Sequence, residues 1–311
     1  MTKILAPSEF IYFLSCSCSA VNQWHVSNDT VFCKKCSRTF YFNENVLDLI
    51  SESELDHIAG RERQSSLRIP DNTDEFLRSV RMERYFIWRN YHSRSRKKPM
   101  KWLARQLMRT NYRQIFLMGA GTGRELLYFQ QFVQLKTVLC SDVSGKVLKM
   151  IPCRCEPYNY TIALFTADIK RYTIIDKESP IIFINVLHHT SDMHAILEGY
   201  CKRAYSDIFM LESCDNVIMR FFARFGLSRR KEYSGIIPDR LNIRKMQAIC
   251  RKHRYTLSLK TWWIFPRDYY YGLFGRIPGF ENMFFFIMEI LTTVTGLFKF
   301  GNVVTAHLKK S

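Results

Sequence analysis

An apolar run followed by three glycines at alternate positions constrains this chain more than any other feature. Residues 115–118 are apolar throughout, as expected of a buried strand. Gly119, Gly121 and Gly123 follow, and residues 124–129 have the apolar spacing of a helix. Glycine is needed where a turn takes backbone angles that a Cβ disfavours and where a ligand closely approaches the main chain. The stretch predicts a strand, a turn and a helix that hold a cofactor against the N–H groups of the helix start.

The glycine spacing argues against two common phosphate-binding turns. A dinucleotide fingerprint, Gly-x-Gly-x-x-Gly, would need a glycine where Arg124 stands. A P-loop would need a lysine and a serine or threonine after its last glycine, and these are also missing. The pattern Gly-x-Gly-x-Gly after a first strand resembles the first motif of class I S-adenosylmethionine-dependent methyltransferases. An ordinary tight turn is the alternative for the glycines taken alone.

The chain beyond the glycines alternates strands and helices, as a doubly wound sheet does. The further strands are expected at residues 137–141, 161–165, 181–185, 207–212, 255–264 and 302–309. In the resembling fold the last two strands form a hairpin, and the seventh is inserted antiparallel. We therefore predict a three-layer α/β fold with a doubly wound, seven-stranded Rossmann-like sheet.

Two aspartates follow predicted strands at places where the resemblance implies cofactor contacts. Asp142 ends the second strand, about twenty residues beyond the last glycine, where a carboxylate can accept both hydroxyl hydrogens of a ribose. The resemblance implies this role for the adenosyl ribose. Asp168 follows the third strand, where the family places an acidic residue beside the adenine amino group. Capping of the next helix or loop is the alternative for each aspartate.

The fourth predicted strand runs into a segment with two adjacent histidines. Residues 185–192 resemble a motif found at this place in many small-molecule methyltransferases. Because ligands bind beyond the carboxyl ends of parallel strands, Asn185 is expected at the cofactor and His188 and His189 at the mouth of the site. Either imidazole is a candidate general base, since histidine titrates near neutral pH. Packing on the cofactor, or capping the helix after Asp192, is the alternative.

Two cysteine pairs near the N-terminus predict a small zinc ribbon. Its four ligands would be Cys16, Cys18, Cys33 and Cys36. The tail of this unit looks like the Trm112-like ribbon domains that precede or partner some methyltransferases. The first pair is Cys-x-Cys rather than Cys-x-x-Cys, so replacement of Cys16 by His25 stays open, as does a ribbon that has lost its metal. Four thiolates leave no open position for water, so the zinc would be structural.

These features divide the chain into three parts: a zinc-ribbon-like segment at 1–50, a helical linker at 51–110 and a methyltransferase domain at 111–311. In the linker, residues 75–88 and 100–108 fit amphipathic helices, and residues 93–99 predict a basic turn that is solvated or contacts phosphates. The methyltransferase domain carries two insertions. That at about 216–238 mixes basic and aromatic residues, and that at about 265–301 is strongly aromatic.

The charge of the chain indicates the partners it attracts. There are 46 Lys and Arg against 28 Asp and Glu, a formal charge of +18, which favours nucleic acid, an anionic membrane surface or acidic substrates. No run of residues is long and apolar enough to predict a transmembrane helix, although peripheral membrane contact is open. Ten cysteines without a convincing secretory signal predict reduced thiols and a cytoplasmic protein.

The resemblance implies methyl transfer from S-adenosylmethionine. The two histidines and the aromatic insertion favour a small-molecule, lipid or glycan-precursor acceptor. The basic charge favours an alternative, a methyltransferase of ribosomal or transfer RNA, although the Asn-Pro-Pro-Tyr type of motif used on base nitrogens is absent after the fourth strand. A non-catalytic methyltransferase-like protein that holds a partner is the third possibility.

Overall fold

The computed structural model describes most of the chain. The described residues are 2–16, 18, 20–50, 54–67, 78, 91–112, 114–156, 159–215, 220, 224, 239–264, 270–271, 277, 280–296 and 300–311. The amphipathic helix expected at residues 75–88 and the insertion at 216–238 lie almost entirely outside these residues.

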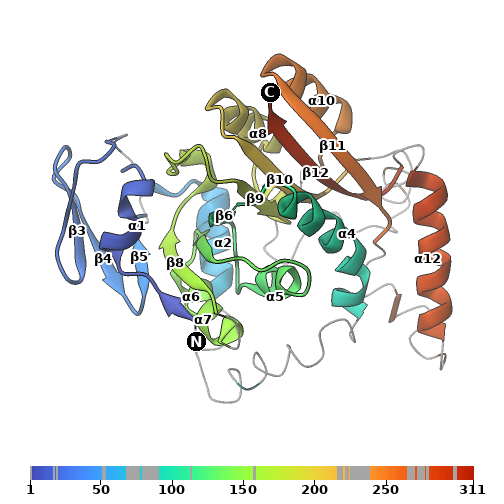
Figure 1. Cartoon of the computed structure of the whole chain (residues 1–311), viewed down its shortest axis with the longest axis horizontal. Helices are drawn as coiled ribbons and strands as arrows, with labels where there is room; N and C mark the ends of the chain where they lie inside the picture. Colours follow the sequence, from blue (N-terminus) through green and yellow to red (C-terminus); the bar gives the residue numbers. More distant parts are fainter. Residues whose placement is uncertain are drawn as a thin grey trace.

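A single mixed sheet organises the molecule (Figure 1). Its C-terminal seven strands follow the order β11-β12-β10-β9-β6-β7-β8. They are β6 (Gln114–Met118), β7 (Thr137–Asp142), β8 (Thr161–Thr166), β9 (Ile181–Ile184), β10 (Asp207–Ser213), β11 (Tyr255–Trp262) and β12 (Val303–Lys310). β6 to β10 are parallel, and β12 lies antiparallel between β10 and β11. The predicted doubly wound sheet with an antiparallel seventh strand is confirmed.

Alternate residues of the central strands enter two separate cores, which gives the fold its three layers. Ile115 and Leu117 of β6 pack with α4 (Tyr91–Met108), α5 (Arg124–Gln130) and α7 (Ile151–Cys155). Phe116 and Met118 face the other way, toward α8 (Met193–Lys202) and α10 (Ile243–Lys252). The short helix α6 (Gly145–Leu148) precedes α7. Because both faces are covered, the central strands are continuous apolar runs rather than alternating ones.

The cysteine-containing segment extends the same sheet. It consists of β1 (Lys3–Ile4), α1 (Pro7–Phe10), η1 (Ile11–Phe13), β2 (Trp24–Val26), β3 (Thr30–Cys33), β4 (Thr39–Asn43) and β5 (Val46–Asp48). β2 to β5 form an antiparallel meander, and β5 pairs in parallel with the second half of β8, while β1 pairs with its first half. Phe10, Phe40 and Leu47 share one buried cluster with Phe116 and Phe165, so this segment and the parallel sheet have a common core.

The linker contains two described helices, of which α4 corrects an expectation. Residues 93–99 are not a basic turn, because α4 begins at Tyr91 and contains Pro99. Its buried side chains include Met100, Leu103 and Leu107 at helical spacing. Four of its cations are exposed, namely Lys97, Lys98, Lys101 and Arg105. Packing of the apolar face against the sheet therefore outweighs the local cost of an internal proline. The other helix, α2 (His57–Leu67), runs beside the ends of the central strands (Figure 1).

The aromatic insertion contains α12 (Phe280–Gly296), which stands at the far edge of the molecule from the cysteine-containing segment (Figure 1). None of the helices in the described part of the chain is both long enough and apolar enough to cross a membrane.

Candidate cofactor site

A cavity of about 620 Å³ lies beyond the carboxyl ends of β6, β7, β8 and β9. Of the residues singled out from the sequence, its walls contain Gly119, Gly121, Asp142, Asp168, Asn185 and His189. Gly123 and His188 are not among the lining residues. Parallel strands that end at one edge thus bring together side chains from four separate segments.

The glycine turn takes the backbone angles that its sequence predicts. Gly119, Gly121 and Gly123 have φ of 64°, 51° and 75°, in the left-handed region that an L side chain disfavours. A Cβ on Gly119 would lie 2.0 Å from Cγ2 of Val186, so the turn packs tightly against the loop after β9. A Cβ on Gly121 would meet no atom within 4 Å, because this glycine faces the cavity. Gly123 is the N-cap of α5.

Asp142 connects the ends of β6 and β7. Its Oδ2 accepts a 2.9 Å hydrogen bond from the N–H of Gly121, and its Oδ1 accepts one of 3.0 Å from the N–H of Ser144. Burial raises the pKa of the Asp142 carboxyl; these two donors and His189 oppose the rise, and Glu62 adds to it. The carboxylate therefore orders the glycine turn and also fixes the main chain at Ser144, the N-cap of the next helix. Each oxygen retains further acceptor capacity toward the cavity.

Asp168 and Asn185 complete the wall on either side of Asp142. Asp168 is 5% exposed, and its Oδ1 accepts a 2.9 Å hydrogen bond from the N–H of Lys170 at the start of a 3-10 turn. Asn185 has a φ of 51°, and its N–H donates to the carbonyl of Leu211 on the neighbouring strand. This left-handed residue turns the chain from β9 toward the histidines.

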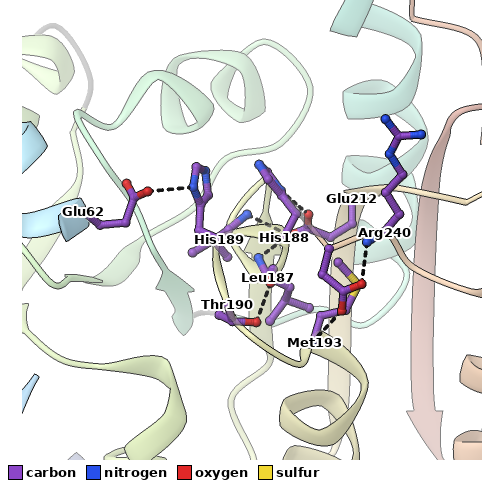
Figure 2. A network of polar contacts seen from close by, with 10 residues as sticks. Glu62, Leu187, His188, His189, Thr190, Met193, Glu212 and Arg240 are labelled. Atoms are coloured by element: carbon purple, nitrogen blue, oxygen red, sulfur yellow. Dashed lines mark hydrogen bonds and ion pairs between the residues drawn. The ribbon is translucent and has the colours of Figure 1, made fainter. Parts of the chain in front are cut away.

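The two histidines have different surroundings (Figure 2). His188 is 8% exposed, and its Nδ1 lies 2.7 Å from Oε2 of Glu212, which is fully buried in β10. The other oxygen of Glu212 accepts hydrogen bonds of 2.7 Å from the N–H groups of both Val186 and Leu187. Glu212 thereby holds the histidine loop onto the sheet with three contacts.

His189 faces the cavity, and its partner comes from the linker. Nδ1 of His189 lies 3.2 Å from Oε1 of Glu62 on α2 (Figure 2). Ser66, one turn further along α2, donates a 2.6 Å hydrogen bond to the hydroxyl of Ser144. Ile58, Ala59, Glu62 and Ser66 all line the cavity and share one face of the helix. The sequence predicts a helical linker here, but the contribution of this helix to the cavity was not predicted.

The four predicted metal ligands lie together at one end of the N-terminal meander. All four sulfur atoms are within 4.8 Å of one another, with Cys16 and Cys36 3.7 Å apart and Cys18 and Cys33 3.7 Å apart. Zinc–sulfur bonds of about 2.3 Å in a tetrahedron place the sulfurs about 3.8 Å apart, so the cluster is compatible with a bound metal. The group contains Cys16 and not His25. The separations are too long for disulfide bonds.

Comparisons with known proteins give likenesses of structure only. No family model matches the chain. No curated protein matches it either. Among solved structures, magnesium protoporphyrin IX methyltransferase from Synechocystis PCC 6803 with bound SAH has a TM-score of 0.48 at 12% identity, covering 80% of this chain and 100% of that one.

Two other likenesses are of similar strength. The plantazolicin methyltransferase BpumL in complex with SAH has a TM-score of 0.44 at 15% identity, covering 84% of this chain and 97% of that one. A chain of the Haloferax volcanii complex that contains the Trm112 methyltransferase activator has a TM-score of 0.44 at 12% identity, covering 70% of this chain and 94% of that one. Likenesses this weak decide neither reaction nor substrate.

The chain's own topology identifies its fold. The strand order, the antiparallel last strand and the glycine turn after the first strand are those expected of the resembling family. The chain has the Rossmann-like fold of class I S-adenosylmethionine-dependent methyltransferases, with an N-terminal four-cysteine unit that is compatible with a zinc ribbon.

Proposed function

We propose that this protein is a methyltransferase that uses S-adenosylmethionine and acts on a small-molecule, lipid or glycan-precursor acceptor. One observation carries the proposal: Gly119, Gly121, Asp142 and Asp168 converge on one cavity beyond the strand ends. The residues fit the cofactor, because an open face at Gly121 lets a ligand approach the main chain and Asp142 retains acceptor capacity.

The roles of the cofactor residues follow from their chemistry. The carboxylate of Asp142 accepts hydrogen bonds from ribose hydroxyls, and Asp168 accepts one from the adenine amino group. S-adenosylmethionine, when bound, supplies a methyl group on a positively charged sulfur. The chain contributes positioning, and α2 covers the cavity and limits the access of water.

His189 is our candidate for proton removal from the acceptor. It lines the cavity, and Glu62 contacts its Nδ1, so that Nε2 is the basic nitrogen when Nδ1 carries the hydrogen. His188 faces Glu212 instead, and we assign it a positioning role in the loop. A base is needed only where the acceptor atom must lose a proton.

Substitution His189→Gln is expected to lower the rate of methyl transfer by about 100-fold or more while leaving S-adenosylhomocysteine affinity within about threefold, because a base acts on the acceptor and not on the cofactor. The rate is measured with methyl-labelled S-adenosylmethionine, and the affinity by calorimetry. A His189→Gln enzyme that turns over at the native rate would remove this histidine from the chemistry.

The acceptor class is tested by incubating the protein with methyl-labelled S-adenosylmethionine and fractionated cell extract. We expect label in the low-molecular-weight or lipid-extractable fraction. Label in nuclease-sensitive material, with binding that falls steeply as salt rises, would support the RNA alternative that the charge of +18 favours. Cofactor binding without transfer to any fraction would favour a non-catalytic partner-binding protein.

We also propose that the four cysteines hold a structural zinc ion. Removal of the metal is expected to lower the thermal midpoint by roughly 10 °C or more, because structural zinc supplies much of the folding free energy of such units. Elemental analysis of protein purified without chelator measures the content, and Cys33→Ser is expected to lose it. Cys153→Ser is the control, since that cysteine lies outside the cluster. Less than about half an equivalent of zinc in the native protein would contradict the proposal.

A further inference from the structure

Helix α12 exposes an uninterrupted apolar stripe. The stripe consists of Met283, Phe286, Ile287, Ile290 and Val294, whose exposed fractions are 50%, 64%, 48%, 49% and 54%. Their spacing of three and four residues places them on one face of the helix. Side chains of this size at this spacing normally face a core.

The two acidic residues of α12 both pair with cations of α4: Glu281 lies opposite the stripe and is partly buried, whereas Glu289 lies at the side of the helix and is exposed. Glu281 lies 3.4 Å from Arg94 of α4, and Glu289 forms an ion pair with Lys98 of the same helix. Toward α4, Phe284 is 7% exposed and packs against Tyr91. The outermost face of the helix is therefore apolar, and its acidic residues are held beside α4. This is the reverse of a surface helix in water.

Basic residues flank the stripe. A cavity of about 830 Å³ between α4, β11 and α12 is lined by Arg94, Lys97, Lys98 and Lys260, and by Phe286 of the stripe itself. Its described lining residues include one acidic residue, Glu289, which pairs with Lys98. Further along α4, Lys101 and Arg105 are exposed, and no acidic residue occurs between Tyr91 and Met108. A cationic surface thus adjoins the apolar stripe.

We propose that α12 and the neighbouring face of α4 dock the protein on an anionic lipid bilayer. The apolar stripe enters the boundary between headgroups and acyl chains, with the helix axis parallel to the membrane. Lipid phosphates meet the cations of α4 and β11, each of which adds to the attraction. A bilayer surface fits better than an apolar protein groove because it offers hydrocarbon and a high density of negative charge side by side. The net charge of +18 acts in the same direction.

This docking is independent of the proposed methyl transfer, since no residue of the stripe lines the cofactor cavity. It is tested by co-sedimentation of the full-length protein with vesicles of phosphatidylcholine alone or with added phosphatidylglycerol. The native protein is expected to bind the anionic vesicles and to dissociate as salt rises.

Two pairs of variants separate the apolar and the cationic parts. Phe286→Ser with Ile290→Ser is expected to weaken partitioning at least about tenfold, because the exposed apolar area is lost. Its matched control is Tyr41→Ser with Val21→Ser, which removes one exposed aromatic and one exposed aliphatic side chain from the N-terminal unit. This control variant should bind vesicles like the native protein. The double variant Lys97→Gln with Lys101→Gln should weaken binding to anionic vesicles. Its control is Lys202→Gln with Lys245→Gln, at exposed positions on α8 and α10, and this variant should bind like the native protein.

Three results would overturn the proposal. The folded native protein could fail to bind either kind of vesicle. The stripe variant could bind as tightly as the native protein. Light scattering could show a dimer that the stripe substitutions dissociate, in which case the stripe would be an interface between two copies of this chain.

Discussion

Substitution Asp142→Ala is expected to weaken the binding of S-adenosylhomocysteine by about 100-fold or more. The variant lacks the carboxylate that accepts hydrogen bonds from the ribose hydroxyls. Hydrogen bonds to a charged group are each worth about 1.5–3 kcal/mol. The substitution would also release the N–H groups of Gly121 and Ser144, which shape the cavity wall. Calorimetric titration gives the affinity, and an unchanged value would contradict the assigned role.

Two controls separate ligand contact from loss of the turn. Asp142→Asn keeps one acceptor oxygen for the main chain and should still lose most of the affinity. Asp192→Ala removes an aspartate that caps α8 through the N–H of Ala195 and does not line the cavity, so it should leave affinity unchanged.

Because burial raises the pKa of Asp142, the affinity of the native protein for S-adenosylhomocysteine should fall on acidification at a higher pH than an ordinary aspartate would give. The reason is that the protonated carboxyl accepts fewer hydrogen bonds.

Substitution Glu212→Leu is expected to destabilise the protein by about 3–5 kcal/mol. The carboxylate is fully buried and satisfies the N–H groups of Val186 and Leu187 as well as Nδ1 of His188. Leucine has a similar volume but offers these groups no oxygen to replace that of Glu212. Glu212→Gln keeps one oxygen for the two N–H groups and should cost less than half as much. Urea unfolding measures both, and native-like stability of the leucine variant would show that Glu212 does not anchor the loop.

Most of the parallel sheet was predictable from the sequence for a physical reason. Strands covered on both faces are continuous apolar runs bounded by polar turns, so β6 to β10 begin and end within about two residues of the expected positions. The glycine turn was equally readable, because only glycine takes three left-handed angles so close together without strain. Topology then placed Asp142, Asp168 and His189 at one edge.

Other parts depend on contacts between distant segments, which local pattern does not encode. The pairing of β5 with β8 joins segments separated by more than 100 residues, and short strands reveal nothing of their partner. Two contacts hold α2 over the cavity: one between Glu62 and His189, and one between Ser66 and Ser144. At α4 the local signals of proline and clustered charge suggested a turn, and burial of Leu103 and its neighbours decided otherwise.

The central claim, that the cavity beside the glycine turn binds an adenosyl cofactor, is tested most directly by calorimetric titration of the native protein with S-adenosylhomocysteine, with NADH as the control ligand. We expect one binding site for S-adenosylhomocysteine and no heat of binding for NADH, since the dinucleotide fingerprint is absent. Absence of S-adenosylhomocysteine binding by the folded protein would contradict the proposed activity and leave a methyltransferase fold that serves another purpose.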